Sequence, residues 1–341
     1  MYYNIMWFNN TVELDKEFAM KKVHIIMYHY VRDLAHSRYP EIRGLDQSLF
    51  IQQMDYIMKH YRVITMESLL EAYSQEDFSG IPENALLLTF DDGYIDHYTV
   101  VYPILKKYGV QGSFFLSAMA VKEHKLLTVN RIHFILAEAE RMGRMAELVS
   151  DCFQSMDKYR LAGAGIEENQ KIYDRIGVPN RWDSGEVIFV KRLLQNELPE
   201  EIRNEMAEEL FAKYVGVPED VFARELYMNR DQVCCMKQGG MFFGIHGYDH
   251  YWLGKLPVEQ MKKDVDQALT YFEGIVDRDC WVMNYPYGNY SDDVIEYIRQ
   301  TGCRLGVSVE ARVAELGKDN PYTLPRLDTN DIYPKGDKGE F

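Results

Sequence analysis

The chain has 341 residues, a net charge of −15 and 47% hydrophobic residues. This apolar content supports a large folded core, and the acidic balance argues against a general nucleic-acid-binding protein, which needs a basic face. No apolar run approaches the roughly 18 residues that a membrane-spanning helix requires, so we expect no membrane span.

The cysteines and the N-terminal segment both bear on the compartment. The chain has five cysteines and no C-x-x-C spacing, so we interpret them as reduced thiols rather than a disulfide framework. Residues 1–19 carry acidic side chains and lack the basic start of a secretory signal, which predicts a flexible leader. Together these features favour a cytoplasmic location.

The first part of the chain alternates short apolar runs with amphipathic segments. Apolar runs predict strands and apolar residues at helical spacing predict helices, in the order strand 23–28, helix 45–61, helix 66–73, strand 85–90, helix 98–108 and strand 112–116. Such alternation predicts an α/β fold around a mostly parallel sheet, either open or closed into a barrel.

The rhythm changes between residues 121 and 236. This segment contains long, charged amphipathic helices and no convincing strand, so we interpret it as a helical insertion. Strands resume at 241–245, 280–284 and 305–309. The predicted α/β unit is therefore divided into residues 20–120 and 237–341. The insertion covers one side of the barrel, forms a lid that shapes substrate choice, or makes an oligomer contact.

An acidic pair follows the predicted strand at 85–90, in the run Thr89-Phe90-Asp91-Asp92-Gly93. Adjacent carboxylates at the end of a buried strand repel each other, and a proton, a cation or a metal must neutralise the pair. The alternative is an N-cap or turn cluster ahead of a helix. In a catalytic site, one aspartate can bind a metal and the other can act as a general base.

A histidine pair follows the predicted strand at 241–245. His246 and His250 are four residues apart, which places both imidazoles on one face of a helical turn. Two histidines and one carboxylate form a common ligand set for Zn²⁺, and also for Fe²⁺, Co²⁺ or Ni²⁺. An aspartate at a neighbouring strand end is well placed to be the third ligand. The alternative is that both histidines are ordinary core or surface residues.

A third cluster, Tyr285-Pro286-Tyr287-Gly288, follows the strand at 280–284. In this order, the three clusters resemble the first three motifs of polysaccharide deacetylases, that is carbohydrate esterase family 4 with its NodB-homology domain. The resemblance covers about residues 20–120 and 237–330. It implies a distorted (β/α)7 barrel, here interrupted by a helical insertion.

The resemblance also implies roles for individual residues. Asp91 would be the general base, and the metal ligands would be Asp92, His246 and His250. Tyr287 would lend its backbone N–H to the oxyanion that forms during attack. One divalent ion is implied, with Zn²⁺ the first choice. The implied reaction is metal-dependent hydrolysis of an N-acetyl group, or an O-acetyl group, from a sugar or a polysaccharide precursor.

This chain departs from the family pattern in two places. The family often has an arginine just before the third motif, where this chain has Asn284. We hypothesise that Arg326 holds Asp91 instead. The late Leu-x-His of the family, whose histidine serves as general acid, is also absent.

Other residues are candidates for the missing role or for support of the metal site. His29 follows the first strand and His97 lies one turn into the helix after Asp91, so each is a candidate active-site group, with a structural hydrogen bond as the alternative. Asp249 lies between the two metal-site histidines and is a candidate hydrogen-bond partner for one of them.

Three functions remain open from the sequence. The first is a metal-dependent carbohydrate deacetylase whose partner is an acetylated sugar or oligosaccharide. The second is a related barrel amidohydrolase that acts on a small non-sugar amide. The third is a non-catalytic barrel that binds glycans, against which the retained aspartates and histidines argue. The sequence leaves the oligomeric state open.

Overall fold

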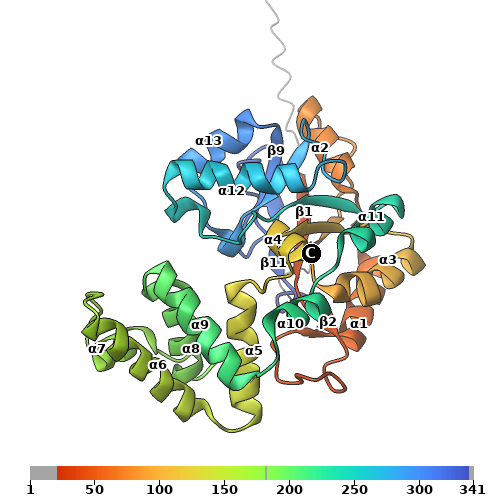
Figure 1. Ribbon diagram of the computed structural model, residues 1–341. Helices are drawn as coiled ribbons and strands as arrows, with labels where there is room; N and C mark the ends of the chain where they lie inside the picture. Colours follow the sequence, from red (N-terminus) through yellow and green to blue (C-terminus); the bar gives the residue numbers. More distant parts are fainter. Residues whose placement is uncertain (1–20, 181–182, 338–341) are drawn as a thin grey trace, which may run out of the picture.

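A computed structural model describes residues 21–180 and 183–337 of the chain (Figure 1). The predicted leader at 1–19 lies outside these residues. The strands are β1 Lys22–Tyr28, β2 Val31–Arg32, β3 Leu45–Asp46, β4 Arg62–Val63, β5 Ala85–Asp91, β6 Ser113–Leu116, β7 Phe242–Ile245, β8 Trp281–Asn284, β9 Cys303–Val307, β10 Ala314–Glu315 and β11 Leu327–Asp328.

Thirteen α-helices and four short helical turns are seen among the described residues. The helices are α1 Gln47–His60, α2 Met66–Gln75, α3 Tyr102–Tyr108, α4 Ala118–Glu123, α5 Thr128–Arg141, α6 Met145–Leu161, α7 Asn169–Ile176, α8 Gly185–Arg192, α9 Glu200–Tyr214, α10 Glu219–Leu226, α11 Arg230–Gln238, α12 Val258–Tyr271 and α13 Asp292–Gln300. The turns are η1 His97–Val101, η2 Leu193–Glu197, η3 Leu253–Lys255 and η4 Pro286–Gly288. No helix in the described ranges is both long and apolar enough to cross a membrane.

A curled, mostly parallel sheet forms the centre of the fold. Its strands follow the order β10-β1-β5-β6-β7-β8-β9, with β11 also paired to β1 and β4 to β5. Strands β1, β5, β6, β7, β8 and β9 are parallel, and β10 is antiparallel to β1. Within the described residues the pairings form an open path rather than a closed ring. The predicted α/β class with a distorted β/α barrel is confirmed.

Strand β5 lies in the interior of this sheet and carries the acidic pair at its end. All seven of its residues are buried, because β1 and β6 flank it and helices cover the sheet. A strand buried on both faces reads as a continuous apolar run, as this one does up to Phe90. Since the neighbouring strands are parallel, the residues that follow β5, β7 and β8 emerge at one edge of the sheet.

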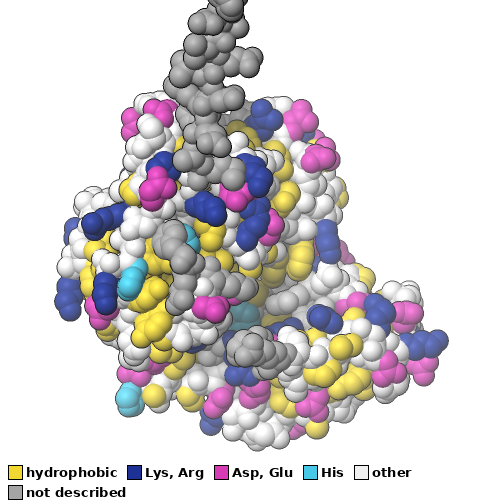
Figure 2. Space-filling model, turned by 180° about the vertical axis from the view of Figure 1, so that it is seen from behind, with side chains coloured by type: hydrophobic (Ala, Val, Ile, Leu, Met, Phe, Trp, Pro, Cys, Tyr) yellow, Lys and Arg dark blue, Asp and Glu magenta, His cyan; other side chains and the backbone are white. Residues whose placement is uncertain are grey.

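The segment between α4 and β7 is helical throughout, with helices α5 to α11. Helices α5 to α9 form a bundle beside the sheet (Figure 1), and from behind the bundle is a lobe on one side of the molecule (Figure 2). Its apolar core is formed by buried residues drawn from between Ala120 and Tyr227. Tyr30 and Tyr94, from the side of the sheet, also belong to this core. Helix α11 instead packs on the barrel core. The division at 121–236 stays a prediction.

Candidate active site

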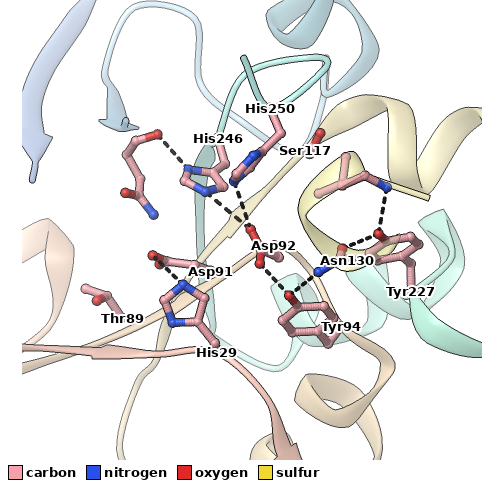
Figure 3. Close-up of polar contacts among 12 residues, drawn as sticks. His29, Thr89, Asp91, Asp92, Tyr94, Ser117, Asn130, Tyr227, His246 and His250 are labelled. Atoms are coloured by element: carbon pink, nitrogen blue, oxygen red, sulfur yellow. Dashed lines mark hydrogen bonds and ion pairs between the residues drawn. The ribbon is translucent and has the colours of Figure 1, made fainter. Parts of the chain in front are cut away.

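Two segments far apart in the sequence meet at the carboxyl edge of the sheet (Figure 3). Asp91 ends β5 and Asp92 follows it, while His246 follows β7 and His250 lies four residues further on. All four side chains belong to buried residues, between 1% and 8% exposed. The structure therefore brings together the acidic pair and the histidine pair that the sequence singled out.

Asp92, His246 and His250 converge on one point. The Nε2 atoms of His246 and His250 lie 3.3 and 3.4 Å from the same carboxylate oxygen, Oδ1 of Asp92. One ligand atom from each residue can be chosen so that all lie within 4.8 Å of one another. The Oδ1 atom is buried and has no hydrogen-bond partner among the described residues. This is the arrangement of a three-ligand metal site with further positions open.

The orientation of the His246 ring fits a cation at this point. Its Nδ1 lies 2.7 Å from the backbone oxygen of Asn284. A carbonyl oxygen only accepts, so Nδ1 carries the proton, and in the neutral ring Nε2 presents a lone pair to Asp92. Lone pairs that face each other at this distance repel unless a cation lies between them. The donor set therefore fits a divalent ion of the zinc type, with the histidine orientation fixed from behind.

Arg326 clamps the neighbouring carboxylate, Asp91. Its Nη1 and Nη2 atoms donate to the two carboxylate oxygens at 2.8 Å each. Burial would raise the pKa of Asp91, but the Arg326 guanidinium and then His29 outweigh it and lower this pKa to about 2. Asp91 is therefore ionised at neutral pH and held in one orientation.

Every N–H group of Arg326 is used. Besides Asp91, the guanidinium donates to Thr89 Oγ1 at 3.1 Å, Asn284 Oδ1 at 2.9 Å and the Ser308 backbone oxygen at 2.8 Å. Asn284 stands where the family that the motifs resemble often has arginine. It supports both halves of the site, because its side chain accepts from Arg326 and its backbone oxygen lies against His246 Nδ1. The structure places Arg326 where the sequence hypothesis needs it, and its catalytic role stays a prediction.

His29 is a further neighbour of Asp91 (Figure 3). Its Nε2 is 3.8 Å from Asp91 Oδ2, and its side chain is 39% exposed. His97 is fully buried behind it and donates from Nε2 to the His29 backbone oxygen at 2.9 Å. Of the two candidate active-site histidines, only His29 faces Asp91, and His97 instead makes a structural hydrogen bond to the His29 backbone.

Left-handed backbone conformations gather at this site. Five non-glycine residues in the described ranges have a positive φ, and three of them are Asp92 at 73°, His250 at 57° and Tyr287 at 57°. Such conformations are strained for residues with a side chain, and they persist where function or surrounding structure requires them. The Tyr287 ring packs edge-on against His250 and stacks on Trp252, with ring centroids 4.6 and 4.5 Å apart.

The expectation that Asp249 hydrogen-bonds a metal-site histidine is wrong. Asp249 accepts instead from the Tyr251 hydroxyl at 2.8 Å. Asp264 on α12, which the sequence did not single out, holds the loop: its two carboxylate oxygens accept from the backbone N–H groups of Tyr248 and Asp249, both at 2.9 Å. Gly247 allows this approach, since a Cβ there would lie 2.9 Å from Asp264 Oδ1 and its φ is +71°.

Two cavities flank the cluster, and helices of the segment between α4 and β7 line both. One, of about 190 Å³, is bordered by His250, Tyr287 and Trp252 and by Arg203 of α9. The other, of about 460 Å³, is bordered by His29 and Tyr30 and by residues of α5 and α8. A larger groove of about 860 Å³ lies elsewhere, over α12 and α13. A substrate on either side of the cluster would therefore touch these helices.

Comparisons with known proteins agree with this geometry. The family model described as polysaccharide deacetylase matches residues 80–149 and 200–306, more than half of the chain. The Bacillus subtilis protein YxkH is 30% identical over 108 residues, which span 31% of this chain and 36% of that relative.

Solved structures show the same fold. The Streptococcus pyogenes deacetylase PplD in complex with acetate superposes with a TM-score of 0.54 at 17% identity, covering 91% of this chain and 92% of that one. IcaB from Ammonifex degensii superposes with a TM-score of 0.52 at 19% identity, covering 92% and 95%. With its motifs, its curled sheet and the matched family model, the chain belongs to the polysaccharide deacetylase family.

Proposed function

We propose that this protein is a metal-dependent carbohydrate deacetylase that hydrolyses an N-acetyl group from a sugar. The observation that carries the proposal is the convergence of Asp92, His246 and His250 on one point beside a second carboxylate, Asp91, that an arginine keeps ionised. Family membership supports the chemistry, and the donor set supports the metal.

Asp92, His246 and His250 would hold the ion. When bound, a divalent metal such as Zn²⁺ supplies Lewis acidity, which lowers the pKa of water and polarises an acyl oxygen. Co²⁺, Ni²⁺ and Fe²⁺ suit the same ligands. The buried surroundings, with each ligand residue at most 8% exposed, keep these electrostatic interactions strong.

Asp91 is proposed as the general base. Two hydrogen bonds from Arg326 fix its carboxylate. Its charge interacts with that of His246, one of the proposed ligands, so we propose that Asp91 lies beside the attacking water. It takes one proton from that water as the new C–O bond forms at the acetyl carbon. The backbone N–H of Tyr287 is the proposed donor to the acyl oxygen during this step.

His29 is proposed as the general acid, the role that the late histidine of the family has and that no late Leu-x-His of this sequence can take. Its ring faces Asp91, and it is open to the 460 Å³ cavity. When the C–N bond breaks, the leaving nitrogen needs a proton, and His29 can deliver one to form the free amine while acetate departs. Mutation of His29 to Gln should therefore lower kcat more than it changes KM.

A small non-sugar amide is the second candidate substrate. The cavity beside His250 and Tyr287 has a volume of only about 190 Å³, which favours a compact ligand. The cavity beside His29 is larger and leaves room for a sugar, so we favour an acetylated sugar or a short oligosaccharide precursor.

The test is acetate release by the full chain loaded with Zn²⁺. The substrates are acetylated nucleotide sugars, chito-oligosaccharides and a simple acetamide, with His246→Ala as the control. We expect release from at least one acetylated sugar, and none from His246→Ala, which should also fail to retain metal. Release from the simple amide alone would favour the small-amide enzyme. Binding of a chito-oligosaccharide without any acetate would favour a glycan-binding barrel.

A further inference from the structure

A chain of buried hydrogen bonds connects the metal-site carboxylate to the helical insertion (Figure 3). The Tyr94 hydroxyl donates to Asp92 Oδ2 at 2.5 Å, and Asn130 Nδ2 donates to the Tyr94 oxygen at 2.7 Å. The Tyr227 hydroxyl donates to Asn130 Oδ1, and the backbone N–H of Leu127 donates to the Tyr227 oxygen at 3.0 Å.

The direction of every bond in this chain is fixed by chemistry. A carboxylate only accepts, so Tyr94 must donate its proton to Asp92, and its oxygen is then left to accept. Asn130 must turn its NH₂ group toward Tyr94, which turns its carbonyl toward Tyr227. The Tyr227 oxygen in turn accepts from a backbone N–H at the start of α5. Each donor therefore points toward Asp92. In a chain of this kind each hydrogen bond polarises the next, so the bonds strengthen one another.

Burial makes these bonds matter. Asn130 and Tyr94 are completely buried, and Tyr227 is 3% exposed. The start of the chain at Leu127, the N-cap of α5, adds the positive end of a 14-residue helix.

This chain of hydrogen bonds has a consequence for the metal site. Tyr94 occupies Oδ2 of Asp92, while Oδ1 faces His246 and His250. We propose that Asn130 of the insertion is a positioning residue that, through Tyr94, fixes Asp92 so that it offers a single oxygen to the metal. The insertion is then part of the metal site and not only a wall for the substrate. This inference rests on the metal site of the proposed function.

The protein offers a matched pair of tyrosines, Tyr30 and Tyr94, for testing this proposal. Tyr30 and Tyr94 are stacked on each other with centroids 3.9 Å apart, and both hydroxyls accept from Asn130 Nδ2, at 2.9 and 2.7 Å. Only Tyr94 contacts Asp92. Mutation of each tyrosine to Phe removes one buried hydroxyl and leaves the ring, so a general packing effect should be alike in the two variants.

The measurement is Zn²⁺ affinity of the full chain, by competition with a chromogenic chelator, with thermal melting of the metal-free protein alongside. We expect Tyr94→Phe to lose about 10- to 100-fold in affinity, the range for partners that orient a metal ligand, and Tyr30→Phe to stay within about threefold of wild type. Equal losses in both variants, or no loss in Tyr94→Phe, would overturn the inference.

A second variant tests the part played by the insertion. Asn130→Leu should also weaken Zn²⁺ binding by about tenfold or more, and it should add little when combined with Tyr94→Phe, because both act on one bond chain. Additive losses in the double variant would contradict the assignment. If the wild-type protein binds no metal at all, the proposed function is wrong. If the wild type binds metal but the variants bind it equally well, only the inference about Tyr94 and Asn130 is wrong.

Discussion

At the scale of single residues, the environment of Arg326 explains how a buried carboxylate can remain charged. Arg326 is 1% exposed and donates to Asp91, Thr89, Asn284 and Ser308. A lysine could not reproduce this pattern, because an ammonium has three donors and no planar fork. The pairing supplies the steadying contact that the family arginine would provide from the position of Asn284.

Loss of Arg326 should destabilise the protein as well as impair turnover. Arg326→Ala leaves Asp91 buried without its partner, which should lower the free energy of unfolding by about 3–5 kcal/mol. Adding Asp91→Asn should restore part of that loss, since the unpaired charge is gone. Urea denaturation of the two variants checks this, and a loss below about 1 kcal/mol in Arg326→Ala would contradict the role of the pair.

At the scale of elements, the loop between β7 and α12 carries both histidines of the candidate metal site. Asp264 on α12 accepts from two consecutive N–H groups of this loop, and Gly247 gives the carboxylate room to approach. Asp264 is 3% exposed, so water does not compete for these bonds. The helix therefore sets the position of the loop, and through it the spacing of His246 and His250.

Asp264→Asn should weaken metal binding although it touches no ligand. One oxygen of the carboxylate becomes an NH₂ group that faces a backbone N–H donor, so one of the two bonds is replaced by repulsion. We expect a loss of about tenfold in Zn²⁺ affinity by chelator competition. Asp266→Asn on the same helix is the control and should retain wild-type affinity. An unchanged affinity in Asp264→Asn would show that the loop holds its shape without this contact.

The sequence could predict the elements that carry the site but not the contacts that support it. The acidic pair, the histidine pair and the tyrosine cluster each follow an apolar run, and parallel strands end at one edge, so their convergence could be expected. Asn130 lies in an amphipathic helix with no spacing that relates it to Asp92. Asp264 likewise stands on an ordinary helix face. Such partners depend on how helices dock, which local patterns do not encode.

The contrast between Asp249 and Asp264 illustrates this limit. Proximity in sequence favoured Asp249 as the partner of a histidine, because it stands next to His250. The structure instead directs Asp249 to Tyr251, while Asp264, 14 residues beyond His250, holds the loop. The nearest polar residue along the chain is therefore not the one that packs against the loop.

At the scale of the whole molecule, buried histidines tie stability to pH. His97 is completely buried, and burial lowers its pKa from 6.5 to about 4. A group with a lowered pKa stabilises the fold above its unfolded pKa, and this contribution is lost as the pH falls through the folded value. Acidification from about pH 6.5 to pH 4 should therefore destabilise the protein through His97.

The comparison with His97→Gln isolates this effect. Glutamine has an N–H that can replace the donor to the His29 backbone oxygen, but it does not titrate. In metal-free protein, the wild type should lose up to about 3 kcal/mol more unfolding free energy than the variant between pH 6.5 and pH 4. Urea denaturation at stepped pH values measures this, and parallel pH curves for the two proteins would contradict it.

The division of work between Asp91 and Asp92 is the central claim for the molecule as a whole. It is tested most directly by measuring bound Zn²⁺ and acetate release on the same preparations of wild type, Asp91→Asn and Asp92→Asn. We predict that Asp91→Asn keeps about one equivalent of metal but loses at least about 100-fold in kcat, while Asp92→Asn loses metal and activity together. Near-native turnover by Asp91→Asn, or loss of its metal, would contradict the account.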